Sequence, residues 1–442
     1  MNRQDAERVW RNFLASLDNQ SLFLKIPFIL SAVLVGLLSV GFAAASERAT
    51  ELFLEMTKHW PYFPLVLTPL ALVGSRWIVL RFAPAAAGSG IPQAVAALDL
   101  ADDNPGVLSR LLGFRILVVK IFSNFFALLG GGVAGREGPM VQIGASIFLA
   151  LGQKLRRYFP KLDNSTLIAS GGAAGIAAAF NTPLGGIVFA IEELIGPHFH
   201  RMRSSMLIAV IIAGLVAQSL VGPYLVFGSL NLAPPDFAII GPTLFVSSFM
   251  GVLGGLSCKL FMTMHTWLAP QSTKRKYLAT GVLGLLLGIL LTFTDPESIA
   301  GGGIPLVREL LWKPGMISPW LGLEKWFGMI LTFMSGIAGG FFAPALAVGA
   351  IFGKIAAQLF ALPHASTLVL IGMVSLLSSM ARAPFTALVL VSEMSNSHAV
   401  ILPLMIASLV GMFVSRLVEK RSYYHFQSEH WKMQLSTSEK TS

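Results

Sequence analysis

The sequence predicts an all-α integral membrane protein with broken transmembrane helices. Of its 442 residues, 54% are hydrophobic and 12% are charged, and the mean hydropathy is +0.71. Soluble domains carry roughly a quarter charged residues, so this chain lacks the polar side chains that a water-exposed surface needs. Uncharged apolar stretches long enough to cross a bilayer recur along the chain, and glycine and proline interrupt many of them. These observations exclude soluble enzymes and soluble binding modules.

Charge and cysteine content exclude two further classes of protein. The net charge of +10 comes from short basic clusters between apolar stretches, as at residues 154–157 and 274–276. This pattern is typical of membrane-flanking charge rather than of nucleic-acid binding. Cys258 is the single cysteine, so the chain forms no internal disulfide and no multi-cysteine metal site. We therefore expect a lipid bilayer around the protein, and no nucleic acid, metal site or cofactor.

The apolar stretches define the expected helices in chain order. Residues 1–20 place arginines beside aromatic side chains and are expected to form an interfacial or cytoplasmic helix. The plainest spans, each near the roughly 20 residues that cross hydrocarbon, are residues 26–46, 204–235, 237–258, 277–294 and 394–415. We expect one half of the membrane domain in residues 21–230, a second half in residues 236–425, and a short polar tail in residues 426–442.

Glycine and proline break the remaining stretches at matching places in the two halves. Residues 88–92 (Gly-Ser-Gly-Ile-Pro) recur as residues 301–305 (Gly-Gly-Gly-Ile-Pro), and residues 132–135 (Gly-Val-Ala-Gly) recur as residues 336–339 (Gly-Ile-Ala-Gly). Broken helices survive in a bilayer where they are buried in protein or line a wet cavity. Duplicated and broken helices are typical of transporters and channels, whose binding sites lie where the repeats meet.

Ionisable side chains within apolar stretches are candidate functional residues, because burying them in hydrocarbon is costly. They are Arg115, Lys120, Arg136, Glu137, Glu192, Glu193, Arg382 and Glu393. Glu137 opens an apolar helix, so its carboxylate lies at the positive helix end, where a halide would also bind. Protonation would release Glu137 and admit the anion. The alternative is a helix cap or a structural pair of Arg136 with Glu137.

The other carboxylates have two interpretations each. Glu192 and Glu193 lie at the end of a membrane segment. One of them passes protons toward Glu137, or the pair simply ends the helix. Glu393 holds the equivalent place in the second half, and we expect it to form a structural pair with Arg382.

Two further positions offer hydrogen-bond donors to an anion. Ser89 places a hydroxyl between two glycines, although the same pattern fits an ordinary turn serine. Phe341 and Phe342 open a second-half helix and present backbone N–H groups. The alternative for the phenylalanines is that they face lipid or the core.

Three motifs resemble the anion-coordinating signatures of the CLC family of chloride channels and chloride/proton antiporters, in the same order. They are residues 88–92, residues 135–139 (Gly-Arg-Glu-Gly-Pro) and residues 340–344 (Gly-Phe-Phe-Ala-Pro). The resemblance covers roughly residues 25–425. It implies two inverted repeats of tilted helices and a homodimer with one pathway in each subunit.

The family's site residues are implied at the matching positions of this chain. The implied anion-binding residues are Ser89, Gly90, Ile91, Phe341, Phe342 and Tyr424, with Tyr423 as the alternative if the register slips by one. Glu137 is implied as the gate, and Glu137 and Glu193 as the proton-transfer residues. Members with both glutamates resemble antiporters, so the resemblance implies a secondary transporter that exchanges chloride for protons.

Several alternatives stay open at this point. A passive chloride channel would share the same fold and gate, and a fluoride/proton exporter is a less favoured alternative because such relatives depart from the serine and tyrosine that this chain retains. We expect no enzymatic activity, because no histidine is placed to activate Ser89. From the short segment after Tyr424 we expect no cytoplasmic nucleotide-sensing domain, and we expect a bacterial inner membrane as the location.

Overall fold

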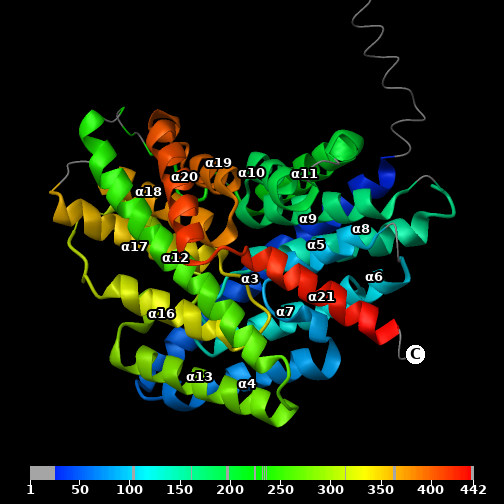
Figure 1. Cartoon of the computed structure of the whole chain (residues 1–442), viewed down its shortest axis with the longest axis horizontal. Coiled ribbons are helices and arrows are strands. Elements are labelled where there is room, and N and C mark those ends of the chain that lie inside the picture. Colours follow the sequence, from blue (N-terminus) through cyan, green and yellow to red (C-terminus); the bar gives the residue numbers. More distant parts are fainter. Residues whose placement is uncertain are drawn as a thin grey trace, which may run out of the picture.

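The described part of the chain is almost entirely helical (Figure 1). The computed structural model describes residues 25–101, 105–160, 162–195, 199–222, 225–230, 232, 234, 236–313, 315–361 and 365–439. The main first-half helices are α3 (Ile26–His59), α4 (Pro64–Phe82), α5 (Ile91–Asp99), α6 (Leu108–Leu111), α7 (Phe114–Leu129), α8 (Glu137–Leu155), α9 (Asn164–Phe180), α10 (Pro183–Phe189) and α11 (Phe199–Val221). The main second-half helices are α12 (Ile240–Leu268), α13 (Thr273–Phe293), α14 (Pro296–Ile299), α15 (Ile304–Trp312), α16 (Leu321–Met334), α17 (Phe342–Leu359), α18 (Ala365–Ala381), α19 (Pro384–Ser395), α20 (Ile401–Val418) and α21 (Tyr423–Glu439).

Eight helices of the described chain are long and apolar enough to cross a membrane, which confirms the expected class. Their ends differ from the expected spans for local reasons. Helix α3 runs on to His59, because Arg48 bridges Glu51 and Glu55 along the helix surface and stabilises a polar extension. The protein is a multi-pass integral membrane protein.

Two expected spans are wrong in extent. The span 394–415 is not one helix, because α19 ends at Asn396, whose φ of 49° is left-handed, and α20 starts at Ile401. The span 204–235 ends early, because Gly222 has a φ of 93° and follows the last residue of α11.

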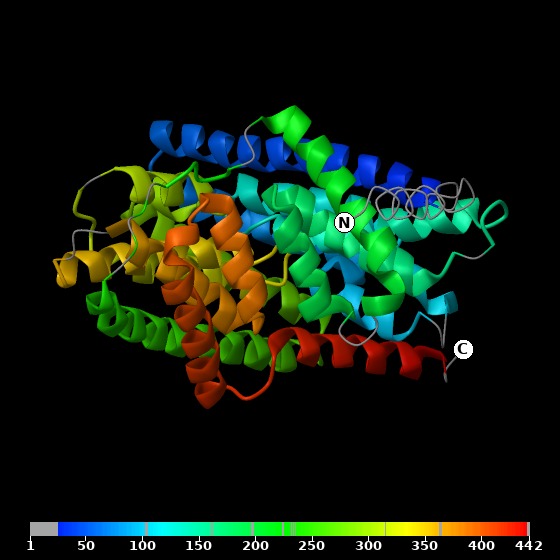
Figure 2. The ribbon, with the colours of Figure 1, turned by 90° about the horizontal axis from the view of Figure 1, so that it is seen from above.

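The two halves pack side by side. In Figure 1, α8, α9 and α11 lie together on one side, and α17, α18 and α20 lie together on the other. Seen from above, α3 runs along one face of the molecule and α21 along the opposite face (Figure 2). Broken helix ends therefore converge between the halves.

Glycines let the inner helix pairs approach closely at equivalent places. A Cβ on Gly171 of α9 would lie 2.4 Å from the carbonyl oxygen of Gly144 in α8. In the second half, a Cβ on Gly372 of α18 would lie 2.0 Å from the carbonyl oxygen of Gly349 in α17. Small residues at such crossings allow backbone-to-backbone packing, which is how membrane helices associate without a hydrophobic drive between them.

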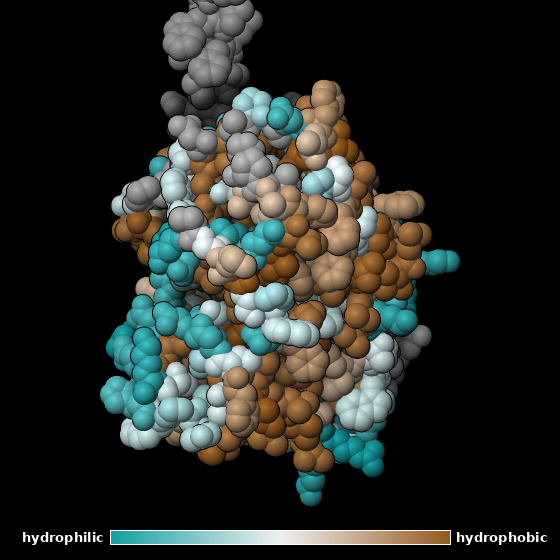
Figure 3. Space-filling view, turned by 90° about the vertical axis from the view of Figure 1, so that its left-hand side faces the viewer, coloured by the Kyte–Doolittle hydropathy of each residue, from teal (hydrophilic) through white to brown (hydrophobic). Residues whose placement is uncertain are grey.

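The outer surface is suited to lipid. Figure 3 shows a face of the molecule on which apolar residues form large patches. Large side chains that are exposed on the outward helices include Leu244, Phe245, Phe249, Leu285, Leu286 and Leu409. A soluble monomer does not expose so much apolar surface.

The two ends of the chain were expected to be a helix and a polar tail. The helix expected in residues 1–20 lies outside the described residues. Residues 426–439 were expected to be a polar tail, but they continue α21, which packs against α5. This helix brings its first turn to the centre of the protein and leaves its far end at the surface.

Candidate functional site

Three glycine-rich loops meet between the halves. Gly88 donates its N–H to the Ile337 oxygen at 2.8 Å and accepts from the Gly339 N–H at 3.1 Å. Gly135 and Gly340 exchange two backbone hydrogen bonds, of 2.8 and 2.9 Å. These bonds hold residues 88–92, 135–139 and 340–344 as one unit, although they are far apart in the sequence.

Ser89 lies at the centre of this unit. It is 2% exposed, and its Oγ has no hydrogen-bond partner among the described residues. Its neighbours Gly88 and Gly90 have φ values of 65° and 98°, in the left-handed region that glycine adopts readily. Gly90 precedes Ile91, the buried first residue of α5. A Cβ on Gly138 would lie 2.2 Å from Ser89 Oγ, so this hydroxyl packs directly against the first turn of α8.

Glu137 is the first residue of α8 and is 3% exposed. Its carboxylate faces the backbone N–H groups of Arg136, of Glu137 itself and of Ala343. Its Oε2 has no hydrogen-bond partner in the described chain and lies 2.1 Å from where a Cβ on Gly135 would be. The carboxylate thus lies at the N-termini of α8 and α17 together, where an anion is favoured.

The inner boundary of the site is aromatic. Phe341 and Phe342 are fully buried at the start of α17. The Phe341 ring stacks on the Tyr424 ring at 5.4 Å between centroids, with 14° between the planes. Tyr424 is 2% exposed, and its hydroxyl has no hydrogen-bond partner among the described residues.

The structure distinguishes the two tyrosines. Tyr424 stacks on Phe341 of the third glycine loop, and its hydroxyl lies within electrostatic range of Ser89 and Glu193. Tyr423 instead packs edge-on against Phe261 at 5.7 Å and lines a cavity of about 190 Å³, called the inner cavity below. Tyr424 is therefore the tyrosine that faces the glycine loops.

Glu193 lies apart from Glu137, in the π-helical turn Ala190–Ile195 that follows α10. It is half-buried and lies within electrostatic range of the Tyr424 hydroxyl. The adjacent Glu192 points elsewhere: its carboxylate accepts the backbone N–H groups of Phe385 and Thr386 at 3.1 and 2.7 Å. Glu192 therefore caps the N-terminus of α19.

Glu393 performs the reciprocal task in the other half, and the expected pair with Arg382 is wrong. Its carboxylate accepts the N–H groups of Leu184 and Gly185 at 3.1 and 2.8 Å, at the N-terminus of α10. Arg382 instead donates to backbone oxygens near the end of α20. The two halves thus exchange helix caps across their interface.

Two buried lysines hold the glycine turns. Lys120 of α7 donates from Nζ to the oxygens of Ala86 and Gly88, at 3.0 and 2.9 Å. Lys325 of α16 donates to the oxygens of Ile299, Ala300 and Gly301 at 2.7 to 3.3 Å. The sequence analysis did not identify Lys325, which follows residues 301–305 at a shorter spacing than that of Lys120 after residues 88–92.

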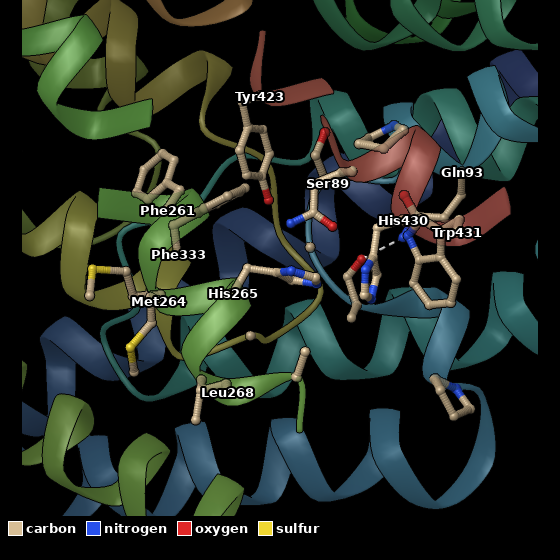
Figure 4. Close-up of a pocket in the computed structure, with 18 of the residues that line it drawn as sticks. Ser89, Gln93, Phe261, Met264, His265, Leu268, Phe333, Tyr423, His430 and Trp431 are labelled. Atoms are coloured by element: carbon tan, nitrogen blue, oxygen red, sulfur yellow. Dashed lines mark hydrogen bonds between the residues drawn. The ribbon is translucent and has the colours of Figure 1, made fainter. Parts of the chain in front are cut away.

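Two cavities approach the site. One, of about 340 Å³, contains Glu137 and Arg136 and is bordered by Glu47, which pairs with Arg136 at 3.2 Å. The other, of about 190 Å³, reaches Ser89 from the side of α12 and α21 (Figure 4). The glycine loops separate the two, as expected of a pathway with a central site.

Comparison with known proteins decides the family. Residues 70–416 match the family model of the voltage gated chloride channels. The chain belongs to the CLC family. A CLC relative from Vibrio vulnificus, the H(+)/Cl(-) exchange transporter ClcA, is 35% identical over 427 residues, which cover 89% of this chain and 87% of the relative.

Solved CLC structures share the fold. A slow cyanobacterial Cl-/H+ antiporter superimposes with a TM-score of 0.79 at 26% identity, covering 93% of this chain and 98% of the antiporter. A CLC-type fluoride/proton antiporter superimposes with a TM-score of 0.75 at 23% identity, covering 93% of this chain and 98% of that protein. These matches agree with an all-α fold of two inverted repeats.

Proposed function

We propose that this CLC protein is a secondary transporter that exchanges chloride for protons. The observation that carries the proposal is the place of the Glu137 carboxylate, at the N-termini of two helices and beside the glycine loops. The N–H groups that face the carboxylate would hold a halide equally well, so the two compete. The relative from Vibrio vulnificus and the cyanobacterial protein both carry names that describe this exchange.

Chloride binds at the glycine loops, between residues 21–230 and residues 236–425. Ser89 and Tyr424 offer the hydroxyl donors, and the unpartnered state of both hydroxyls leaves them free to bind an anion. Gly90 and Ile91 at the start of α5, with Phe341 and Phe342 at the start of α17, supply backbone N–H groups.

Protons travel through two carboxylates. Glu137 takes up a proton from the cavity of about 340 Å³ that contains it, becomes neutral and leaves the site to chloride. Glu193 passes the proton to and from the inner side, and it lies within electrostatic range of Tyr424. A half-buried Glu193 outside the glycine loops keeps the proton route apart from the chloride route.

The proposed assembly is a homodimer with one pathway per subunit, in a bacterial inner membrane. The helices α10, α11, α19 and α20 share apolar surface available for a second copy. Their large exposed side chains include Leu184, Ile211, Leu215, Phe385, Leu402 and Leu409.

Reconstitution in liposomes tests the proposal. The vesicles have an outward chloride gradient, equal pH on both sides, and a potential clamped by potassium and valinomycin. Exchange predicts that chloride efflux acidifies the lumen, and that Glu137→Gln abolishes the acidification. The matched control is Glu309→Gln, which changes an exposed carboxylate paired with Lys313 and should behave as the wild type.

Three results would contradict the proposal in different ways. Chloride efflux without any pH change means a passive channel. Proton uptake driven by fluoride but not by chloride means a fluoride exporter. No flux of either anion means that the chain does not transport halides.

A further inference from the structure

The inner cavity carries a set of cationic side chains that the central site does not use. Arg76 of α4, Lys276 of α13, His265 of α12 and His430 of α21 line it, together with Ser89 at its closed end. Figure 4 shows His265 and His430 beside the same space, with their rings facing it. Four helices far apart in the sequence therefore place cations around one cavity of about 190 Å³.

The two histidines form a pair. Their ring centroids are 4.5 Å apart and the rings are perpendicular, at 88°. His430 meets the Gln434 side chain at 2.7 Å, whereas the buried Nδ1 of His265 has no hydrogen-bond partner in the described chain. A buried ring nitrogen without a partner is uncommon and is available to a ligand.

No carboxylate neutralises these cations within the described lining of the cavity. His265 is surrounded electrostatically by His430, Arg76 and Lys276, all of like sign when charged. The remaining titratable group of the lining is Tyr423.

The acidic residues of the neighbouring helices are engaged elsewhere. Asp99 of α5 and Glu429 of α21 both pair with Lys432 and do not line the cavity. The described lining of the cavity therefore has a net positive charge, which favours an anion.

We propose that Arg76, His265, Lys276 and His430 form an inner-mouth anion site, which holds a halide more tightly when the histidine pair has taken up a proton. The site lies on the route to Ser89, so it concentrates the transported anion at low internal pH. This inference rests on the proposed function only in taking the bound anion to be the transported one.

Linkage gives the direction of the effect. An anion near an imidazole favours its charged form, so halide binding and histidine protonation strengthen each other by the same factor. When the cavity holds no anion, the two adjacent histidines and the two further cations disfavour protonation of the pair. A bound anion offsets this repulsion and so increases the proton affinity of the histidines. A coupling of about fivefold, at the low end of the usual range, is expected for a water-filled cavity.

Chloride binding to the purified full-length protein, measured by calorimetry, tests the site. Every variant carries Glu137→Gln, so that the gate contributes no pH dependence. We expect chloride affinity in this background to be about fivefold higher at about pH 5.5 than at about pH 8. Adding His265→Gln and His430→Gln should remove that difference. Adding His425→Gln, at an exposed histidine of the same helix, should leave it.

The outcomes separate this site from the transport mechanism. Retained affinity at about pH 8 shows that the double histidine substitution leaves the central site folded. An unchanged pH dependence without the histidine pair overturns the inner-mouth site but not exchange. A passive chloride flux in liposomes overturns exchange but not the site. If the histidine substitutions abolish all chloride binding, the Lys276→Gln variant tests the site instead. The proposal predicts that this variant binds chloride more weakly than the Glu137→Gln background at both pH values. An unchanged affinity overturns the inner-mouth site.

Discussion

The reciprocal helix caps of the two halves allow a quantitative prediction. Glu393→Ala removes the acceptor of two backbone N–H groups at the N-terminus of α10. A hydrogen bond to a charged group contributes about 1.5–3 kcal/mol, and loss of an N-cap costs about 0.5–2 kcal/mol. Because Leu184 is 60% exposed, water or lipid headgroups replace part of the loss. We expect Glu393→Ala to reduce the free energy of unfolding by about 2 kcal/mol.

Glu192→Ala provides a comparison within the same molecule. Glu192 accepts two backbone N–H groups and, in addition, the Thr386 hydroxyl at 2.7 Å. The extra bond should raise the loss to about 3 kcal/mol. Glu393→Gln keeps one carbonyl acceptor and should lose about half as much as Glu393→Ala.

Thermal unfolding in detergent, followed by tryptophan fluorescence at a fixed scan rate, measures the order. The Tm should be highest for the wild type, lower for Glu393→Gln, lower again for Glu393→Ala and lowest for Glu192→Ala. The control is Glu309→Gln, which alters an exposed ion pair and should not shift the Tm. A wild-type Tm for either alanine variant, or an equal fall in the control, would refute the assignment of these carboxylates as caps.

Three further predictions concern the site and its supports. Tyr424→Phe keeps the ring stack on Phe341 but removes a hydroxyl donor, so chloride affinity measured by calorimetry should fall about fivefold; unchanged affinity would mean that the hydroxyl does not reach the anion. Lys325→Met leaves buried carbonyls without a donor, so the Tm should fall by an amount equivalent to about 2 kcal/mol, whereas Lys58→Met at an exposed position should not lower it. Burial lowers the pKa of His430, so its contribution to stability is present above its unfolded pKa of about 6.5 and is lost as the pH falls below it. In halide-free buffer the Tm should therefore fall less on acidification in His430→Gln than in the wild type, and equal falls would contradict this.

The sequence predicted those parts of the protein that depend on local chemistry. Glycine and proline at residues 88–92 and 135–139 mark broken helices because the backbone there adopts left-handed or capped conformations that few other residues allow. An ionisable residue in an apolar stretch is recognisable at once, which identified Glu137. The match of motifs between the halves reveals the repeat from the sequence alone.

The sequence did not predict which elements that are distant along the chain contact each other. Glu393 was assigned to Arg382, which is near it in the chain, but its partners are Leu184 and Gly185 in the other half. Nothing in the sequence says that α10 and α19 pack against each other, with the C-terminal end of each at the N-terminus of the other. The helix over residues 426–439 was also missed, because its polar composition resembles a tail until its packing on α5 is seen.

The inner histidines show the same limit. His265 lies in the last turn of α12 and His430 lies in α21, and their spacing along the chain carries no periodic signal. They meet because α12 and α21 converge on the inner cavity. Only the three-dimensional arrangement makes them a pair.

The central claim is that one protein couples the movements of protons and chloride. The most direct test is whether a proton gradient alone drives chloride movement. Wild-type protein is reconstituted with equal chloride on both sides and a proton gradient as the single driving force. Coupled exchange predicts that chloride accumulates against its own rising gradient until that gradient balances the proton gradient. The Glu193→Gln variant should lose this uphill movement, while chloride still flows down an imposed gradient. Chloride that never accumulates above equilibrium, with normal downhill flux, would contradict the account.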